Sequence, residues 1–539
     1  MNALTVLFGG NLADEAFKPV FGGKSAFSLA LERAAAFPGT KKVVLLGKAG
    51  MEPPGACSLI TGEWTVSLLL KTLSEAAEGF DFAYYAWADT PFLDRELAGK
   101  IADRHCRFAA DYSYADGWPG GLAPELLGPG TAGILCKIAG TLGEGRVERD
   151  SIFAVLQKDI NSFDIETEIS TVDLRYHRLN LGADSRRNLL LLERFAESGI
   201  LAEDSTSAAV EKLVAEKPEL LRTLPNFSTI QVTDACTETQ GAGSCAFCPY
   251  RGARPVPAWE SNAGAINPSG FMAPERFAEL LDGIEAFAGD AVLDISLWGE
   301  IALHPECETL IGMVLERPAL SLVVETSGIG WKAGAPKRIA GMVRGAPDSG
   351  SPAAPPRKNG MAALSWIVSL NENDLPVPPG VPPDPARPAA AFAGELAEYF
   401  PKMDRDQVYV QAIRTKGAED AIERFYRAWK KSEAGIIIQK YNSFCGALPD
   451  RNAADLSPVK RRPCWHIMRD FVVLSGGGVP FCANACPELW NGNDVLLGNV
   501  FTGGLREIWE RGEERYREHC REEYRGICSN CDEYYTYNF

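Results

Sequence analysis

Apolar runs alternate with amphipathic stretches through the first part of the chain. ALTVLF (3–8) and KVVLLG (42–47) have the continuous apolar character of buried strands. Residues 25–37 and 94–105 space their apolar side chains like helices, and FAYYAWAD (82–89) reads as a strand that ends in a carboxylate. Because strands alternate with helices, we expect a parallel α/β sheet here.

After a helix-like connection at 187–224, the alternation resumes. Helical stretches such as 274–289 separate several of the new apolar runs, so the pattern predicts a second βα array, long enough for most of a βα barrel. The stretches 345–360 and 375–390 are rich in proline and glycine and predict loops or spacers. The expected strands of this array are 228–235, 291–299, 320–328, 364–371, 407–413 and 434–441.

Composition narrows the class of protein. The chain has 539 residues, 46% of them hydrophobic, and a formal net charge of −17, which disfavours sequence-independent nucleic-acid binding. It contains no apolar run of membrane-spanning length and no basic segment typical of a signal peptide, so we expect a cytoplasmic protein with no membrane partner. Fourteen cysteines in a reducing compartment favour metal ligands over disulfides.

Three of these cysteines lie in CTETQGAGSCAFC, residues 236–248, on the loop that follows the first strand of the second array. Active sites of βα barrels lie at this end of the strands. A structural zinc site normally needs a fourth ligand, which is not close in sequence, and a disulfide is disfavoured by compartment. A [4Fe–4S] cluster on three thiolates, with one open iron, is the third interpretation, and the spacing alone leaves the three open.

The later strand ends carry further motifs: SLWGE up to residue 300, VVETSG up to 328, VSLN up to 371 and VQAIR up to 414. Together with the cysteine loop and the aromatic Phe247, this order resembles the radical S-adenosylmethionine superfamily, with WGE in place of its GGE motif. The family has three residues in the first cysteine gap, whereas this chain has eight, in a glycine-rich insert that can loop out.

The resemblance implies a [4Fe–4S] cluster on Cys236, Cys245 and Cys248, whose open iron binds S-adenosylmethionine. One electron from the cluster then yields a 5′-deoxyadenosyl radical that abstracts hydrogen from the substrate. The implied contacts to S-adenosylmethionine include Glu300 to the methionine ammonium. The full set of residues that the resemblance implies for S-adenosylmethionine binding is Gly299, Glu300, Ser327, Ser369, Gln411 and Arg414.

The last residues of the chain hold a second set of cysteines. A cysteine, a GGG turn at 476–478, a second cysteine, an LGNV segment, an IW helix and a closing CxxC resemble the SPASM extension of radical enzymes. The resemblance implies one auxiliary [4Fe–4S] cluster on Cys464, Cys482, Cys528 and Cys531, although zinc accepts the same set. Cys486 is left as an alternate ligand or a substrate neighbour, and Cys520 as structural.

The start of the chain resembles sugar-nucleotide cytidylyltransferases. LFGGNLADEAFKPVFGGKS matches their glycine-rich loop, Lys-Pro pair and GGK turn, and YYAWADTPFLDRELAGKI matches their metal-binding segment. This implies a Rossmann-like nucleotidyltransferase-type domain with Lys18 and Asp89 as a nucleotide or metal site. The arginine expected in the first loop is replaced by Asp14 and Glu15, which repel a triphosphate, so a degenerate domain is expected.

The order of these three parts resembles the spirochaetal spiro-SPASM family. We expect a nucleotidyltransferase-like domain at 1–200, a helical linker at 201–225, a partial radical barrel at 226–445 and an auxiliary cluster domain at 446–539. The expected partners are an electron donor such as flavodoxin or ferredoxin and a peptide or nucleotide-linked small-molecule substrate. The alternatives are a nucleotidyltransferase with a regulatory Fe–S module and a non-catalytic metal-binding scaffold.

Overall fold

The computed structural model describes residues 1–53, 55–141, 145–236, 247–249, 270–345, 354, 357–370, 388–400, 407–485, 487, 490 and 492–536. The chain divides into two compact units, 1–223 and 224–539. Most of the segment expected as a linker, 201–225, thus belongs to the first unit. Within the described residues, no helix combines the length and the apolar character that crossing a membrane requires.

The first unit is built on a seven-stranded sheet with the order β3-β2-β1-β4-β6-β5-β7. Only β6 pairs antiparallel with its neighbours, and the other pairs are parallel. The strands are β1 (Ala3–Phe8), β2 (Thr40–Gly47), β3 (Ser58–Thr61), β4 (Phe82–Trp87), β5 (Tyr112–Asp116), β6 (Glu125–Leu127) and β7 (Ile165–Ile169). The expected strands and the α/β class are confirmed here, and β3, β5, β6 and β7 are additions that the apolar pattern did not indicate.

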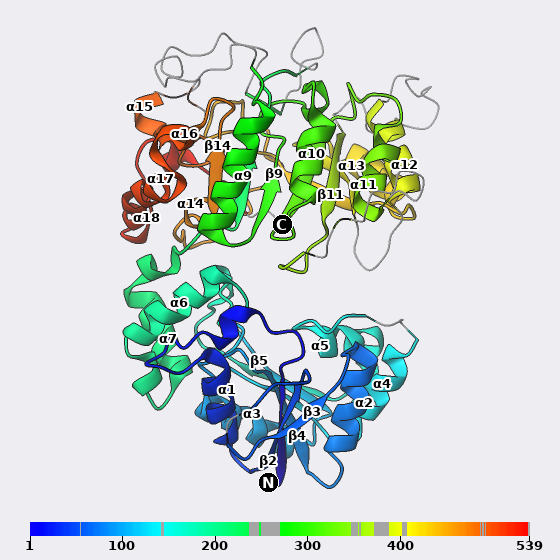
Figure 1. Cartoon of the computed structure of the whole chain (residues 1–539), viewed down its shortest axis with the longest axis vertical. Helices are drawn as coiled ribbons and strands as arrows, with labels where there is room; N and C mark the ends of the chain where they lie inside the picture. Colours follow the sequence, from blue (N-terminus) through cyan, green and yellow to red (C-terminus); the bar gives the residue numbers. More distant parts are fainter. Residues whose placement is uncertain are drawn as a thin grey trace. The chain divides into compact units, whose positions relative to one another are not determined.

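Helices cover this sheet (Figure 1). One apolar core joins strands β1, β2 and β4 to α2, α4 and α5, and it includes Leu69, Leu73 and Leu135, all at 1% exposure or less. Asp94 begins α3 because its carboxylate accepts a hydrogen bond from the backbone of Leu97. The helices are α1 (Ala26–Ala35), α2 (Val66–Ala76), α3 (Arg95–Phe108), α4 (Thr131–Ala139), α5 (Ser151–Leu156), α6 (Arg186–Glu197) and α7 (Thr206–Glu216).

The second unit has a seven-stranded sheet with the order β13-β12-β11-β10-β9-β8-β14. Strands β8 to β13 follow one another in chain order and are parallel, the winding of a barrel wall, and β14 pairs parallel with the outer side of β8. The strands are β8 (Phe227–Ile230), β9 (Ala291–Asp294), β10 (Leu320–Thr326), β11 (Leu364–Leu370), β12 (Val408–Arg414), β13 (Gly435–Lys440) and β14 (Asp470–Val473).

Five helices pack on this sheet, as Figure 1 shows for α9 to α13. Pro274 opens α9 at a position where the missing N–H is not needed, and Gly289, at a φ of 87°, ends it. The five are α9 (Pro274–Ala288), α10 (Cys307–Leu315), α11 (Ala335–Arg344), α12 (Pro388–Tyr399) and α13 (Glu419–Trp429).

The cysteine-rich end of the chain is joined to the same sheet through β14. A tight turn at Gly477, at a φ of 85°, leads from β14 to β15 (Gly478–Pro480), which pairs antiparallel with β16 (Leu496–Asn499). The expected turn at 476–478 is thus present. Short helices complete this part: α14 (Trp465–Arg469), α15 (Gly492–Val495), α16 (Val500–Gly503), α17 (Leu505–Arg511) and α18 (Glu513–Cys520).

Candidate metal centre

A cavity of about 460 Å³ opens at the carboxyl ends of the strands in the second unit. Each of the six strands β8 to β13 contributes a polar side chain to its wall, and five of the six are among the last two residues of their strand. A parallel sheet brings such strand ends to one edge, where βα proteins place their active sites. The six residues are Thr229, Asp294, Glu325, Ser369, Gln411 and Lys440.

The other wall of the cavity is rich in thiols. The four cysteines expected to hold an auxiliary cluster line it together, although they are up to 67 residues apart in the chain (Cys464 to Cys531). Two more cysteines line the same cavity: Cys248 from the loop after β8, and Cys445, which the sequence analysis did not single out. The four are Cys464, Cys482, Cys528 and Cys531.

Short local structures hold these cysteines in place. Cys464 caps the start of α14, and its backbone N–H donates to Nδ1 of His519, at 3.3 Å. Cys528 lies in a 3-10 turn over Gly526–Asn530, and Cys531 directly follows it. Cys464 is 6% exposed and Cys528 5%. Buried thiols held from separate segments can serve as a preorganised set of metal ligands.

The electrostatics of the thiols favour a cation among them. Burial, followed by the charge of neighbouring thiolates, raises the pKa of Cys464 and Cys482 well above the usual thiol range. Burial also raises the pKa of Cys528 to about 11. A bound metal reverses this penalty, because coordination removes the thiol proton outright. Without a bound cation, these thiols therefore resist deprotonation. A positively charged iron–sulfur core would stabilise their thiolates.

A set of four thiols accepts either one metal ion or an iron–sulfur cluster. Among the described residues, no three His, Cys, Asp or Glu side chains converge closely enough to hold a single metal ion. Instead the four expected ligands surround a shared cavity. A [4Fe–4S] core takes one thiolate at each iron and so needs its ligands apart, around a cage. The geometry of the thiols alone therefore leaves both the iron–sulfur and the zinc alternatives open.

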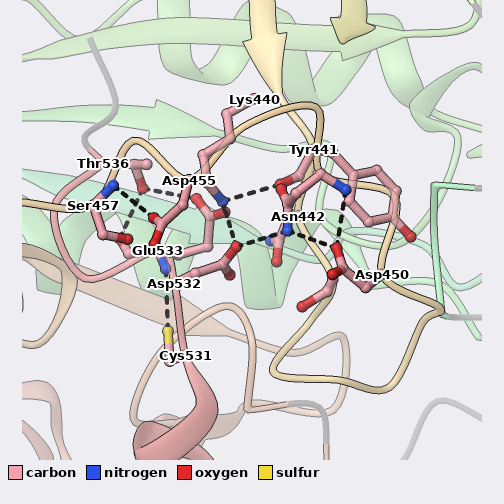
Figure 2. A network of polar contacts seen from close by, with 12 residues as sticks. Lys440, Tyr441, Asn442, Asp450, Asp455, Ser457, Cys531, Asp532, Glu533 and Thr536 are labelled. Carbon is pink, nitrogen blue, oxygen red and sulfur yellow. Dashed lines mark hydrogen bonds and ion pairs between the residues drawn. The ribbon is translucent and has the colours of Figure 1, made fainter. Parts of the chain in front are cut away.

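Lys440, the last residue of β13, ties the closing CxxC segment to the barrel wall (Figure 2). Its Nζ donates to Oδ2 of Asp532 at 2.7 Å, to Oε1 of Glu533 at 2.5 Å and to the carbonyl oxygen of Tyr441 at 3.0 Å. The backbone N–H of Glu533 in turn donates to Sγ of Cys531 at 3.4 Å. The ammonium of Lys440 thus fixes the segment from which Cys531 projects.

A carboxylate that sequence analysis left without a role organises the polar wall. Oε1 of Glu325 accepts hydrogen bonds from Oγ of Ser369 at 2.5 Å and from Nε2 of Gln411 at 2.9 Å. Ser369 and Gln411 are register partners on β11 and β12, which is why both reach Glu325. The structure thus brings these two expected residues together. The signal that could have found Glu325 is a single acidic residue inside the apolar run LSLVVET.

Asp294 lies next to this group. Burial, and then the charge of Glu325, raises the pKa of Asp294 to about 7. Its Oδ1 accepts a hydrogen bond from the backbone of Ser296, whose Oγ accepts one from the backbone of Glu325. Burial likewise raises the pKa of Glu325, against the bonds from Ser369 and Gln411. Two carboxylates with raised pKa values therefore face one cavity, and Asp294 can hold or release a proton near neutral pH.

Glu300 lies outside the lining of this cavity and joins two strand ends instead. Its carboxylate is 4% exposed and accepts from Oγ1 of Thr326 at 2.6 Å, from N and Oγ of Ser327 at 2.8 and 2.7 Å, and from N of Ala302 at 3.4 Å. These bonds occupy the four lone-pair positions of a carboxylate. Burial raises the pKa of Glu300 despite them.

Gly299 has a steric role. A Cβ at this position would lie 2.0 Å from the carbonyl oxygen of Thr233, so no other residue fits beside the segment that leads into the cysteine loop. The backbone N–H of Glu300 donates to the carbonyl of Ala235 at 2.8 Å, a second contact between the WGE turn and this segment. The WGE turn and the start of the cysteine loop are therefore held together by backbone contact.

The remaining expected residues of this unit are less well tied to the cavity. Arg414, at the end of β12, is exposed, and Cys236 is half-buried at the end of a described segment. Cys245 and Cys486 lie outside the described residues, so the convergence of the three loop cysteines stays a prediction. Cys520 ends α18 and is not part of the cavity lining.

In the first unit, the two expected residues have separate partners. Lys18 pairs with Glu15 at 3.2 Å. Asp89 is 1% exposed, and the guanidinium of Arg149 donates to its two oxygens at 3.2 and 2.5 Å and to Asp184 at 3.3 Å. The carboxylate of Asp89 is thus already neutralised by an arginine that sequence analysis missed. Arg149 also lines a second cavity, of about 320 Å³, together with Glu125, whose pKa burial raises to about 7.

Comparisons with known proteins agree with the thiol set. Residues 464–532 match the model of SPASM, an iron-sulfur cluster-binding domain. The chain is 32% identical over 395 residues to an uncharacterized protein of Treponema pallidum (strain Nichols), covering 72% of this chain and 98% of that protein. A second uncharacterized protein of the same organism is 37% identical over 51 residues, covering 10% of this chain and 23% of that one.

Among solved structures, a cytidylyltransferase from Leptospira borgpetersenii is similar to 41% of this chain, at 16% identity and a TM-score of 0.34, with 95% of its own chain covered. BtrN in complex with AdoMet and 2-DOIA is similar to 57% of this chain, at 15% identity and a TM-score of 0.34, with 93% of its chain covered.

The fold and the thiol cavity define a two-unit α/β protein with a C-terminal iron–sulfur cluster-binding domain. The chain belongs to the same family as the first of the two Treponema pallidum proteins.

Proposed function

We propose that this protein is a radical S-adenosylmethionine enzyme with one auxiliary [4Fe–4S] cluster, of the spirochaetal spiro-SPASM type. The observation that carries the proposal is the cavity of about 460 Å³ in the second unit. Strand-end polar residues form one of its walls, auxiliary thiols form the other, and Cys248 of the CTETQGAGSCAFC loop lines it as well. A reactive group on the cysteine loop would thus face the same space as the auxiliary cluster.

Cys236, Cys245 and Cys248 would hold the first cluster, and Cys464, Cys482, Cys528 and Cys531 the second. When bound, the first cluster supplies one electron to S-adenosylmethionine and so generates the 5′-deoxyadenosyl radical. The protein's own part is to position the reactants and to keep water out. Burial of the thiols at 464 and 528 supports such exclusion around the second cluster.

The polar wall is suited to hydroxyl groups. Glu325 accepts from Ser369 and Gln411, and the remaining lone pairs of these three side chains can accept hydrogen bonds from a ribose or a substrate hydroxyl. Glu300 fits the methionine ammonium only if one of its present donors turns away, and the rotatable hydroxyl of Ser327 is the donor that can do so. We therefore assign Glu300 primarily to holding the ends of β9 and β10 together.

The substrate remains a peptide or a nucleotide-linked small molecule. A cavity of about 460 Å³ is of the size that takes a small molecule or a few side chains. The proposed electron donor is a flavodoxin or ferredoxin, and the proposed compartment is the cytoplasm. For the first unit, the Arg149–Asp89 pair disfavours nucleotidyl transfer, because a metal ion would have to displace the guanidinium.

The proposal is tested by iron, sulfide and zinc analysis, with electron paramagnetic resonance, on anaerobically purified protein. Two [4Fe–4S] clusters require about eight irons per chain, falling to about four when Cys236, Cys245 and Cys248 are replaced by alanine. Reduction with S-adenosylmethionine should release 5′-deoxyadenosine from the wild type and none above background from the triple variant. Zinc without labile sulfide, unchanged by the substitutions, would refute the radical function.

A further inference from the structure

Among the residues that the structure describes, five cysteines, rather than four, line the part of the cavity assigned to the auxiliary cluster. A [4Fe–4S] core has one thiolate position at each iron, so one of the five is in excess. We propose that Cys445 belongs to the auxiliary ligand set and alternates with Cys531 at one iron. The inference rests on the auxiliary-cluster part of the proposed function and is independent of S-adenosylmethionine chemistry. Cys445 lies outside the matched cluster-binding domain, which begins at Cys464.

The loop that carries Cys445 has a defined conformation that buries its thiol beside the cavity. Phe444 and Cys445 both have left-handed backbones, with φ of 50° and 57°, an uncommon conformation for residues other than glycine. Backbone bonds from Gly446 and Leu448 to the carbonyl of Ser443 close the turn. Cys445 is 4% exposed. The turn therefore holds the backbone of Cys445 beside the cavity.

Two further contacts place this loop against the segments of other ligands. Asn442 donates to Oδ1 of Asn484 at 3.0 Å, two residues after Cys482. Asn452 donates to Oδ2 of Asp532 at 3.3 Å, one residue after Cys531. With the bonds of Lys440 to Asp532 and Glu533, the chain on either side of Cys445 is fastened to the Cys531 segment (Figure 2).

The thiols of Cys445 and Cys531 form a hydrogen-bonded pair. The two side chains therefore compete for the same region of the cage. An exchange between them is balanced without any co-reactant. The incoming thiol forms an iron–sulfur bond, the outgoing one breaks it, and the proton of the first passes to the second along the hydrogen bond. No electron is gained or lost.

The test uses the full chain with Cys236, Cys245 and Cys248 replaced by alanine, so that only the auxiliary site remains. Iron and sulfide are counted after anaerobic reconstitution and desalting, with Cys445→Ala, Cys531→Ala and the double variant in this background. We expect about four irons in each single variant and fewer than about one in the double variant. The electron paramagnetic resonance spectra of the two single variants should differ, because the fourth thiolate comes from a different residue.

Two controls accompany the test. Cys520→Ala removes a cysteine that does not line the cavity and should leave about four irons. Cys464→Ala should lose them. If the parent protein itself holds no iron and sulfide after reconstitution, the auxiliary cluster is absent and the proposed function fails. Circular dichroism of the metal-free proteins shows whether the double variant is folded. Loss of iron in either single variant, or its retention in a folded double variant, would overturn the proposal for Cys445.

Discussion

Gly299 is the residue whose identity is most tightly set by its surroundings. Adding a methyl group there places it 2.0 Å from the carbonyl oxygen of Thr233, a backbone atom that cannot turn aside. We expect Gly299→Ala to lower the free energy of unfolding by about 2–4 kcal/mol, because the WGE turn must move away from the cysteine loop. Urea unfolding of the metal-free protein measures the loss.

Gly312 provides the matched comparison. It lies inside α10, and a Cβ there meets nothing nearer than Sδ of Met342, at 3.9 Å. Since alanine is the better helix former, Gly312→Ala should raise the free energy of unfolding by about 0.5–1 kcal/mol. Opposite signs at the two glycines are the expected result. A Gly299→Ala protein as stable as the wild type would show that the turn yields without cost.

Asp294 links the cavity to pH. Its folded-state pKa of about 7 is above its ordinary value of 3.8, so the folded chain keeps a proton that the unfolded chain has lost. The unfolded state therefore binds fewer protons between these values, and stability falls as the pH rises from about 4 to about 7. Asp294→Asn removes this pH-dependent contribution to the free energy of unfolding. Its size is on the order of 1–2 kcal/mol, because water in the cavity screens part of the effect of burial on the carboxyl group.

The measurement is urea unfolding of metal-free protein at several pH values. The difference in stability between Asp294→Asn and wild type should grow in favour of the variant from pH 5 to pH 8. Asp420→Asn removes an exposed carboxylate from α13 and controls for the change in net charge. Parallel pH profiles of Asp294→Asn and wild type would contradict the expectation.

At the scale of elements, the junction between β13 and the closing CxxC segment depends on one cation. Lys440 is 14% exposed and satisfies two carboxylates, at Asp532 and Glu533. Lys440→Met leaves these two acids facing each other without a counter-charge. We expect a loss of about 2–4 kcal/mol in the second unit. The auxiliary site should also lose iron faster to a chelator, because Cys531 is then poorly positioned.

Lys430→Met, at the exposed end of α13, is the control for removing a lysine. Lys440→Arg should recover part of the loss, since it restores the charge. Chelator-induced iron release, followed by absorbance, separates the two effects. If Lys440→Met released iron at the rate of the Lys430→Met protein, the bonds from Lys440 to Asp532 and Glu533 would have no part in holding the CxxC segment.

The elements were predictable from the sequence where the apolar pattern is continuous. The buried strands β1, β10 and β11 and the helix α9 lie where the pattern placed them, because burial on both faces of a strand favours a long run of mostly apolar residues. The half-polar strand β7 and the three-residue strand β6 were missed, since neither bears a hydrophobic run. The expected strand at 291–299 ends earlier, at Asp294.

The site was predictable where residues share a motif and not where they meet only in space. Cys528 and Cys531 were predictable from their CxxC spacing, and Ser369 was predictable from its position at the end of an expected strand. Cys445 has no partner cysteine near it in sequence, and it reaches the cavity only because its loop follows β13 at the same sheet edge. Arg149 likewise meets Asp89 from 60 residues away, a contact that no local pattern signals.

At the scale of the whole molecule, the proposed metal ligands all belong to one of the two units. All the cysteines with a proposed metal role lie in the unit 224–539, whereas the unit 1–223 contains Cys57, Cys106 and Cys136 and has its own apolar core. A metal cluster stabilises only the structure that holds it, because binding to the folded state shifts its own unfolding equilibrium. Iron should therefore affect the two units differently.

We expect anaerobic calorimetry of the full chain to show two transitions, one of which responds to iron. Removing the clusters by chelation should lower the unfolding temperature of the second unit by ~5–10 °C and leave that of the first unchanged. Hydrogen exchange resolved by peptide assigns each transition, since β1 and β4 report the first unit and β10 and β11 the second. The Cys464→Ala protein, purified in the same way, should already show part of the lower temperature. Equal shifts in peptides of both units would mean that the chain unfolds as one body, and the division at residue 223 would then describe packing alone and not stability.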